Sequence, residues 1–249
     1  MSVVSTWTDV PGGRMHARVT TAEPARELQA VFVHGIGVAS PYFAPTLACL
    51  APDHRGHALD LPGFGLSYKP ERTLKVAELA DALAAWMEAA GMGAAAIVGN
   101  SFGAQVATQF AVRHRDRTAC IALLGPTMDS HARTAVRQIA RWLRNSVHER
   151  PSQLPLIVRD YRAAGLRRIL ETFRDALRDR IEERLPRIEV PALVVRGELD
   201  PIVPQRWAEE CVELLPRGRL VVVPDAAHTL NYNAPGETAR ILSGFLHEA

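Results

Sequence analysis

The chain has 249 residues, a formal net charge of +2 and 47% hydrophobic residues. This length and hydrophobic fraction favour one well-packed domain and exclude an intrinsically disordered chain. A net charge so close to zero argues against bulk attraction to nucleic acid or to anionic membranes. No apolar run is long enough for a transmembrane helix, and no signal-peptide pattern opens the chain, so we expect a cytoplasmic protein.

The cysteines Cys49, Cys120 and Cys211 show neither the even number of a disulfide framework nor the C-x-x-C spacing of a zinc site. All three lie in apolar stretches, where buried free thiols are the ordinary interpretation. The chain also lacks an H-E-x-x-H motif and clustered His, Cys and carboxylate spacing. We therefore expect no metal ion and no other cofactor.

Short apolar runs alternate with helical patterns along the chain. Residues 1–22, broken by Pro11-Gly12-Gly13, predict an opening hairpin. Six later runs are apolar throughout, as strands are when a parallel sheet is covered on both faces. Strand–helix alternation of this kind predicts an α/β sheet. The predicted strands are residues 30–35, 57–63, 94–100, 119–125, 192–197 and 219–225, and the predicted helices are residues 74–91, 101–114, 204–215 and the segment from Pro235.

Residues 127–189 interrupt this alternation. They contain no strand candidate, whereas apolar residues recur at helical spacing, as at Val136, Ile139 and Leu143. We predict a helical insertion there, between a core domain formed by residues 1–126 and 190–249.

The basic residues are unevenly distributed between the insertion and the core. Residues 126–190 hold 14 Arg against 9 Asp and Glu, a local charge of +5, whereas the remainder has a local charge of −3. Attraction of an anionic substrate and self-association of the insertion with the core are both consistent with this pattern. The arginines at 133, 137, 141 and 144 form either a solvated helix face or a clamp for a substrate carboxylate.

Residues Gly99-Asn100-Ser101-Phe102-Gly103 follow an apolar run and open a predicted helix. This is the strand–turn–helix setting of a G-x-S-x-G nucleophile. The sharp turn exposes the Ser101 hydroxyl, and the glycines let strand and helix approach without Cβ clashes. A match arises by chance in about one chain in ten of this length, and the required context lowers that several-fold. We predict that Ser101 is the nucleophile.

A serine nucleophile needs a general base. Among nine histidines, His228 is favoured because it lies on the loop between the last predicted strand and the last helix. The competing interpretation is a loop histidine that caps this helix.

The base needs a carboxylate that orients it and stabilises the imidazolium. Asp200 is favoured because it follows a predicted strand and forms a turn with Pro201. Glu198 and Asp129 are alternatives, whereas Asp225 is too near the histidine in the chain.

Attack on a carbonyl creates an oxyanion, which backbone N–H groups stabilise. We expect one from Phe102 and the other from Ile36, with Gly37 as second choice, on the loop H-G-I-G after the third strand. An ordinary glycine turn is the competing interpretation of this loop. The residues expected to contact the substrate are His34, Gly35, Asn100, Trp142 and Tyr161. The apolar residues of the insertion either line an acyl pocket or, as we favour, pack its helices together.

The motifs HGIG (34–37), DLPGFGLS (60–67), GNSFG (99–103), GELDPIVP (197–204) and AHTLNYNAP (227–235) resemble the α/β-hydrolase superfamily across the whole chain. The resemblance implies a mostly parallel central sheet flanked by helices, the catalytic order Ser–acid–His, and a helical lid (cap), residues 127–189, after the sixth strand. A serine nucleophile argues against haloalkane dehalogenases and epoxide hydrolases, whose nucleophile is Asp.

Asn100 before the nucleophile is similar to meta-cleavage product hydrolases, which cut C–C bonds in dienoates. Those enzymes commonly read H-G-x-G-P-G, whereas Val38 and Ala39 follow the second glycine of this loop. They also commonly carry Trp after the catalytic histidine, where this chain has Thr229. These departures favour esterase or thioesterase activity.

The sequence thus predicts a serine hydrolase that cleaves a small carboxylic ester through an acyl-enzyme. C–C bond hydrolysis and thioester or lactone hydrolysis are the alternatives, and a non-catalytic binding protein on this fold is the third class. The expected partner is a small-molecule substrate, and the more specific hypothesis is that this substrate is anionic. We expect a monomer or homodimer, with no nucleic-acid or membrane partner.

Overall fold

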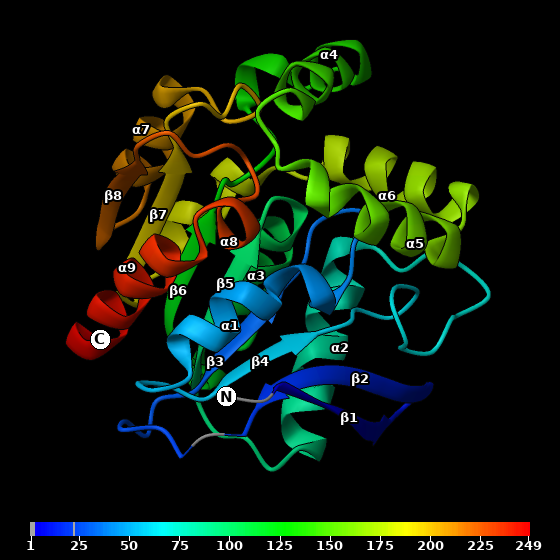
Figure 1. Ribbon diagram of the computed structural model, residues 1–249, viewed down its shortest axis with the longest axis vertical. Coiled ribbons are helices and arrows are strands. Elements are labelled where there is room, and N and C mark those ends of the chain that lie inside the picture. Colours follow the sequence, from blue (N-terminus) through cyan, green and yellow to red (C-terminus); the bar gives the residue numbers. More distant parts are fainter. Residues whose placement is uncertain (1–2, 22) are drawn as a thin grey trace.

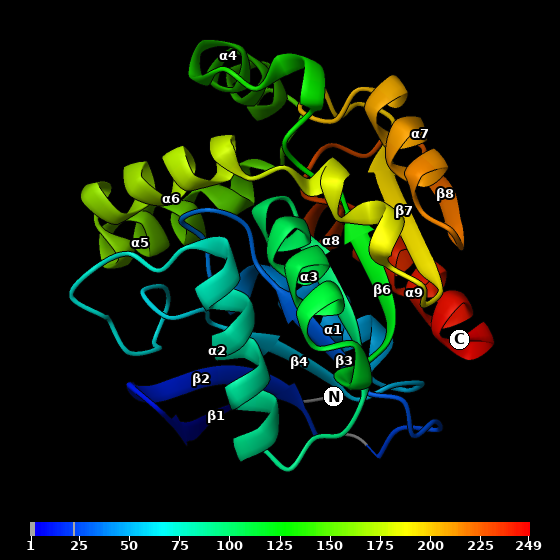
Figure 2. The ribbon, with the colours of Figure 1, turned by 180° about the vertical axis from the view of Figure 1, so that it is seen from behind.

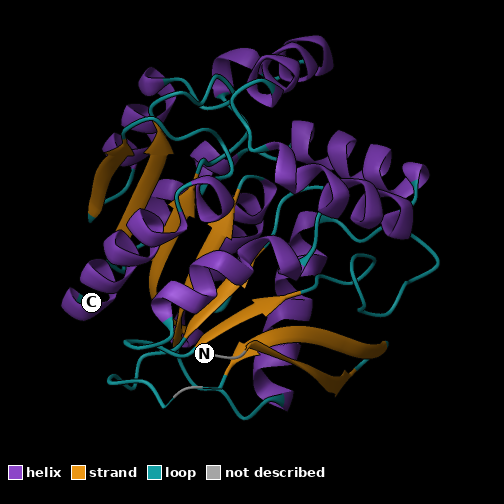
Figure 3. Cartoon of the chain, in the orientation of Figure 1, coloured by secondary structure: helices purple, strands orange, loops and turns teal. Residues whose placement is uncertain are grey.

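The computed structural model describes residues 3–21 and 23–249. Within these residues the chain forms one eight-stranded sheet of order β1-β2-β4-β3-β5-β6-β7-β8. Strand β2 pairs antiparallel with β1 and β4, and the later neighbours are parallel (Figure 1; Figure 3). The strands are β1 (Val3–Val10), β2 (Gly13–Thr20), β3 (Ala30–Val33), β4 (Gly56–Leu59), β5 (Ala95–Asn100), β6 (Thr118–Leu124), β7 (Ala192–Gly197) and β8 (Gly218–Val223).

This order confirms the predicted α/β sheet and its opening hairpin. Met1, Ser2 and Ala22 of the predicted hairpin segment lie outside the described residues.

Both faces of the sheet are covered by helices. One apolar cluster contains Val31 and Val33 of β3, and a second contains Ala30 and Phe32 of the same strand. Because successive strand side chains point to opposite faces, a strand covered on both faces is apolar throughout. Helices α2 (Val76–Ala89), α3 (Phe102–Arg113) and α7 (Gln205–Leu214) cover one face. Helices α1 (Ala44–Leu50), α8 (Leu230–Asn233) and α9 (Pro235–Glu248) cover the other (Figure 1; Figure 2).

Helices α1 and α8 were not expected from the sequence, because seven and four residues are too short for a periodic pattern. One cysteine prediction is wrong: Cys49 on α1 is exposed, whereas Cys120 and Cys211 are buried. Among the described residues, no helix combines the length and the hydropathy needed to cross a bilayer.

The segment between β6 and β7 is helical, as predicted. Its helices α4 (Ala135–Ser146), α5 (Leu154–Ala164) and α6 (Leu166–Arg178) lie beyond the carboxyl ends of the parallel strands (Figure 1; Figure 2). Helix α6 packs on the core through partly buried apolar residues, including Phe173.

Helix α4 differs from the expectation. Its buried residues are the polar Gln138 and Asn145, whereas Ile139, Trp142 and Leu143 are 48%, 48% and 56% exposed. These apolar side chains therefore face solvent more than either a pocket lining or helix packing predicts.

Candidate active site

Ser101 occupies the turn between β5 and α3, with φ 58° and ψ −121°. A Cβ atom on Gly99 would lie 2.3 Å from the carbonyl oxygen of Gly103, and one on Gly103 would lie 2.0 Å from the carbonyl oxygen of Val33. Both positions therefore require glycine, because the start of α3 lies so close to the end of β5 at Gly99 and to the end of β3 at Gly103. The geometry of the turn is the one that the G-x-S-x-G motif predicts.

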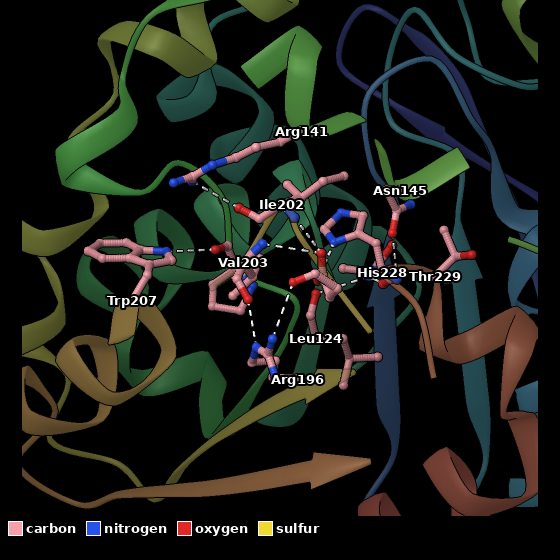
Figure 4. Close-up of polar contacts among 12 residues, drawn as sticks. Leu124, Arg141, Asn145, Arg196, Ile202, Val203, Trp207, His228 and Thr229 are labelled. Atoms are coloured by element: carbon pink, nitrogen blue, oxygen red, sulfur yellow. Dashed lines mark hydrogen bonds and ion pairs between the residues drawn. The ribbon is translucent and has the colours of Figure 1, made fainter. Parts of the chain in front are cut away.

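The loops after β7 and β8 bring Asp200 and His228 together. The Nδ1 atom of His228 lies 2.7 Å from Oδ2 of Asp200, and both side chains are buried. The other oxygen, Oδ1, accepts hydrogen bonds from the N–H groups of Ile202 at 2.8 Å and Val203 at 3.2 Å (Figure 4). Nδ1 is therefore assigned as the donor, which leaves Nε2 as the acceptor. Nε2 is buried and has no hydrogen-bond partner among the described residues.

Two opposing effects act on the His228 ring. Burial alone lowers its pKa, but the charge and hydrogen bond of Asp200, together with the charge of Glu149, outweigh burial and raise the pKa. The pair thus stabilises the imidazolium that forms when a base takes up a proton.

The rival carboxylates are engaged elsewhere. Asp129 forms ion pairs at 2.8 Å with both Arg141 and Arg206. Glu198 accepts a hydrogen bond at 3.1 Å from the backbone N–H of Asp225. Of these three carboxylates, Asp200 is the one that the structure pairs with His228.

The loop after β3 lies against the nucleophile. A Cβ atom on Gly35 would lie 3.6 Å from the Ser101 hydroxyl oxygen. The N–H of Gly35 donates to the Tyr42 hydroxyl at 3.1 Å, so it is already occupied. No hydrogen bond within the described part of the chain engages the N–H of Ile36 or of Phe102. These two amides are available to a ligand.

His34 and Asn100 use their polar atoms within the protein. Nε2 of His34 accepts from the Leu61 N–H at 3.0 Å, and Nδ1 donates to the Gly35 carbonyl at 2.8 Å. Asn100 accepts from the Tyr42 hydroxyl at 2.9 Å and donates to the Leu124 carbonyl at 3.0 Å.

This engagement changes the interpretation of both side chains. Burial lowers the pKa of His34, which keeps its ring neutral. The polar atoms of both side chains connect neighbouring segments of the protein, and their contact with a substrate stays a prediction.

The insertion reaches the loop after β3 through Tyr161 of α5. A Cβ atom on Gly37, where φ is 79°, would lie 2.6 Å from Cε1 of Tyr161. Trp142 of α4, also expected to contact the substrate, is 48% exposed. The structure therefore places Tyr161, but not Trp142, against a predicted site loop.

Several insertion arginines are bonded within the protein. Arg133 pairs with Glu182 at 2.6 Å, and Arg137 donates to the carbonyl of His131 at 2.8 Å. With Arg141 on Asp129, three of the four arginines considered for a carboxylate clamp already have partners. Among residues 3–21 and 23–249, no three His, Cys, Asp or Glu side chains group as metal ligands would.

Gly125, which the sequence analysis missed, lies directly under the His–Asp pair. A Cβ atom there would lie 3.0 Å from both Cε1 and Nδ1 of His228 and 3.4 Å from Oδ2 of Asp200. Its φ of 55° is also unfavourable for a side chain. A glycine immediately after an apolar strand was the available signal.

We expect Gly125→Ala to lower kcat/KM by about tenfold or more, because the new methyl group displaces the His228 ring. Gly91→Ala is the matched control, since Gly91 has φ 65° but no neighbour within 4 Å of its Cβ position. Both variants should lower Tm, and only Gly125→Ala should lower kcat/KM. Equal kinetics for the two variants would contradict a role for this contact.

A sequence model of the alpha/beta hydrolase family matches residues 30–241. The chain belongs to the alpha/beta hydrolase family. The matched region of this hydrolase begins at β3 and reaches α9, so it includes the turn with Ser101 and both loops of the His–Asp pair.

This alpha/beta hydrolase is similar to enzymes of differing specificity. It is 29% identical over 79% of its length to pimeloyl-[acyl-carrier protein] methyl ester esterase of Neisseria meningitidis serogroup B, covering 84% of that enzyme. It is 25% identical over 88% of its length to 2-hydroxymuconate semialdehyde hydrolase of Pseudomonas putida, covering 87% of it. The structure of the enol-lactonase from Burkholderia xenovorans LB400 superimposes with a TM-score of 0.82 at 21% identity, over 97% of this chain and 100% of that one.

Proposed function

We propose that this alpha/beta hydrolase is a serine carboxylesterase that cleaves a small ester through an acyl-enzyme. The observation that carries the proposal is the buried His228–Asp200 pair, whose unpartnered Nε2 belongs to the same sheet edge as the strained Ser101 turn. A nucleophile, a base and an orienting carboxylate at one edge are the parts that acyl transfer needs.

The reaction follows from these roles. The Ser101 hydroxyl oxygen attacks the ester carbonyl while Nε2 of His228 takes its proton, and Asp200 holds the ring and stabilises the imidazolium. The resulting oxyanion is bound by the N–H groups of Ile36 and Phe102. Collapse breaks the C–O bond, and the imidazolium protonates the leaving alcohol. Water, deprotonated by His228, then attacks the acyl group, which leaves as the acid and restores the serine.

The insertion serves as the lid of this site. Tyr161 of α5 packs on Gly37 of the loop that carries Ile36, so α5 lies against the proposed oxyanion loop. The basic insertion supports a small anionic substrate, although the clamp by Arg133, Arg137 or Arg141 is disfavoured by their protein partners.

C–C bond hydrolysis is the second candidate. It is supported by Asn100 before the nucleophile and by the similarity to 2-hydroxymuconate semialdehyde hydrolase. Ester hydrolysis is favoured over it by the departures at Val38, Ala39 and Thr229 and by the similarity to a methyl ester esterase.

A fluorophosphonate probe followed by peptide mass spectrometry tests the nucleophile, and we expect a single adduct on Ser101. A panel of p-nitrophenyl esters, thioesters, lactones and a chromophoric dienoate then separates the candidate reactions. Ester turnover without loss of the dienoate chromophore is the expected result. An unlabelled Ser101 with no turnover favours a binding protein, and dienoate cleavage without ester turnover favours the second candidate.

The pH profile gives an independent prediction. The base must be neutral to accept the serine proton, and the pKa of His228 is raised from its ordinary value of 6.5. Activity should therefore fall as the pH decreases, with a kcat/KM midpoint above pH 6.5. A midpoint below this value would contradict the assignment of the base.

A further inference from the structure

Residues of the lid form hydrogen bonds with the catalytic loop after β8, in addition to the contacts of this loop with the core. Oδ1 of Asn145, the buried residue at the end of α4, accepts from the backbone N–H of His228 at 3.2 Å (Figure 4). The amide nitrogen of Asn145 donates to Oε1 of Glu149 at 2.6 Å. The lid therefore grips the main chain of the histidine itself, and Glu149 orients the residue that does so.

Glu149 also grips the residue after the histidine. Its carboxylate accepts from the backbone N–H of Thr229 at 3.1 Å and from the Thr229 hydroxyl. The amide of Asn233, one turn further on in α8, donates to the same carboxylate. Gln153 donates to the Thr229 hydroxyl at 3.1 Å. Lid residues thus bind the catalytic loop at the histidine N–H and at Thr229, and they also bind Asn233 at the end of α8.

The same helix reaches the loop of the catalytic carboxylate. Arg141, one turn before Asn145 on α4, donates to the carbonyl of Ile202 at 3.3 Å. The N–H of Ile202 in turn binds Oδ1 of Asp200 at 2.8 Å. Figure 4 shows Arg141 beside Ile202 and Asn145 beside His228. One lid helix therefore contacts both loops whose relative position sets the His–Asp distance.

Helix α4 buries polar side chains and exposes apolar ones, so these polar contacts determine its position on the core. Val136 and Val147 are each 79% exposed, and the buried side chains of the helix are polar. A helix whose apolar residues face solvent gains little from hydrophobic packing on the core. Its hydrogen bonds and ion pairs must then hold it down.

Resting on the proposed function, we propose that Asn145 and Glu149 of the lid are positioning residues for the catalytic histidine. They fix its loop through the His228 N–H and Thr229, so that a seated lid and a correctly placed base are one state of the molecule. Thr229 is the departure from the meta-cleavage pattern, and its hydroxyl is the group that Glu149 and Gln153 share. A tryptophan there offers no hydroxyl for this network.

If Glu149 positions the histidine, replacing it should change the pKa of His228, which the loss of a merely structural contact would not do. The charged groups that act on the His228 ring are Asp200 from the loop after β7 and Glu149 from the lid. Arg141 and Arg196 bind backbone carbonyls of the Asp200 loop, those of Ile202 and Asp200 respectively. Glu149→Gln preserves the shape but removes a negative charge, so the His228 pKa should fall. The acid limb of kcat/KM then moves to lower pH by about half a pH unit.

We expect Glu149→Gln and Asn145→Ala each to lower the plateau of kcat/KM by about tenfold for the preferred p-nitrophenyl ester. Only Glu149→Gln should move the acid limb, and Glu149→Asp should recover the wild-type limb because it keeps the charge. Glu189→Gln is the matched control, since it removes a lid charge that pairs with Arg115 and lies 76% exposed. It should change neither the plateau nor the limb.

The His228 pKa, followed by NMR of imidazole-labelled protein, measures the same shift without turnover. The NMR measurement of the His228 pKa can still be made if Glu149→Gln lowers Tm enough to complicate the kinetics. Asn145→Ala tests independently the hydrogen bond to the His228 N–H. A plateau within twofold of wild type for both variants, with an unmoved limb, would overturn the positioning role. Ester turnover that persists in Ser101→Ala would instead remove the proposed function, so the two failures are distinguishable.

Discussion

Ser101→Ala is expected to lower kcat/KM for ester hydrolysis by about 10⁴-fold or more. The change removes the one oxygen that the strained turn presents at the sheet edge beside Gly35. Alanine keeps the Cβ atom and lacks only the hydroxyl, so the fold should be retained. Steady-state kinetics on the best ester, with circular dichroism and Tm of the variant, measure both effects.

Ser243→Ala is the matched control. Ser243 lies on α9, far from the Ser101 turn in the sequence, and its hydroxyl donates to Asp53 at 2.7 Å. It should retain full activity. Substantial ester turnover by Ser101→Ala, with the fluorophosphonate adduct found on another residue, would refute the assigned nucleophile.

Asp200→Asn is expected to lower kcat by about 10⁴-fold while leaving KM nearly unchanged. An amide at this position can no longer hold the proton on Nδ1 of His228 or stabilise the imidazolium. The Ile202 and Val203 N–H groups that now bind Oδ1 fix the amide oxygen toward the backbone and leave its NH₂ group facing the ring. The imidazole then adopts the tautomer that cannot accept the serine proton.

Asp129→Asn tests whether loss of a buried negative charge is by itself enough to lower kcat as Asp200→Asn does. It removes a buried carboxylate that pairs with Arg141 and Arg206, so it should lower the free energy of unfolding by about 2 kcal/mol and Tm by about 6 °C. Its kcat should stay within about tenfold of wild type. If Asp129→Asn abolishes turnover and Asp200→Asn does not, the two carboxylates have been assigned to the wrong roles.

Local patterns in the chain were sufficient for the architecture. Fully apolar runs predicted the parallel strands because a strand covered on both faces buries every side chain, as Ala30 to Val33 do. The spacing around Ser101 predicted the turn because the close approach at Gly99 and Gly103 excludes any side chain. The contact of Gly99 with Gly103 joins near neighbours in the chain, so a short stretch of sequence contains it, whereas the contact of Gly103 with Val33 of β3 comes from the tertiary structure.

The polar contacts depended on the tertiary structure. Asp200 and His228 are 28 residues apart, and Asn145 and His228 are 83 apart. The turn with Pro201 favoured Asp200, but Asp129 also follows a strand and stayed an alternative; the arginines that occupy Asp129 come from α4 and α7. Likewise, the backbone partners of the His34 and Asn100 side chains come from residues distant in the sequence, Leu61 and Leu124, which no local pattern indicates.

The amino-acid sequence alone specified the sheet, the helical insertion after β6 and the turn at Ser101. Only the tertiary structure decided which carboxylate meets the histidine, and that α4 turns its polar side inward. Apolar periodicity predicts that a helix has an apolar and a polar face, but it does not predict which element packs against each face. On α4 the acceptor for the His228 N–H is buried and Val136 is exposed, because the groups to be satisfied lie on the catalytic loop.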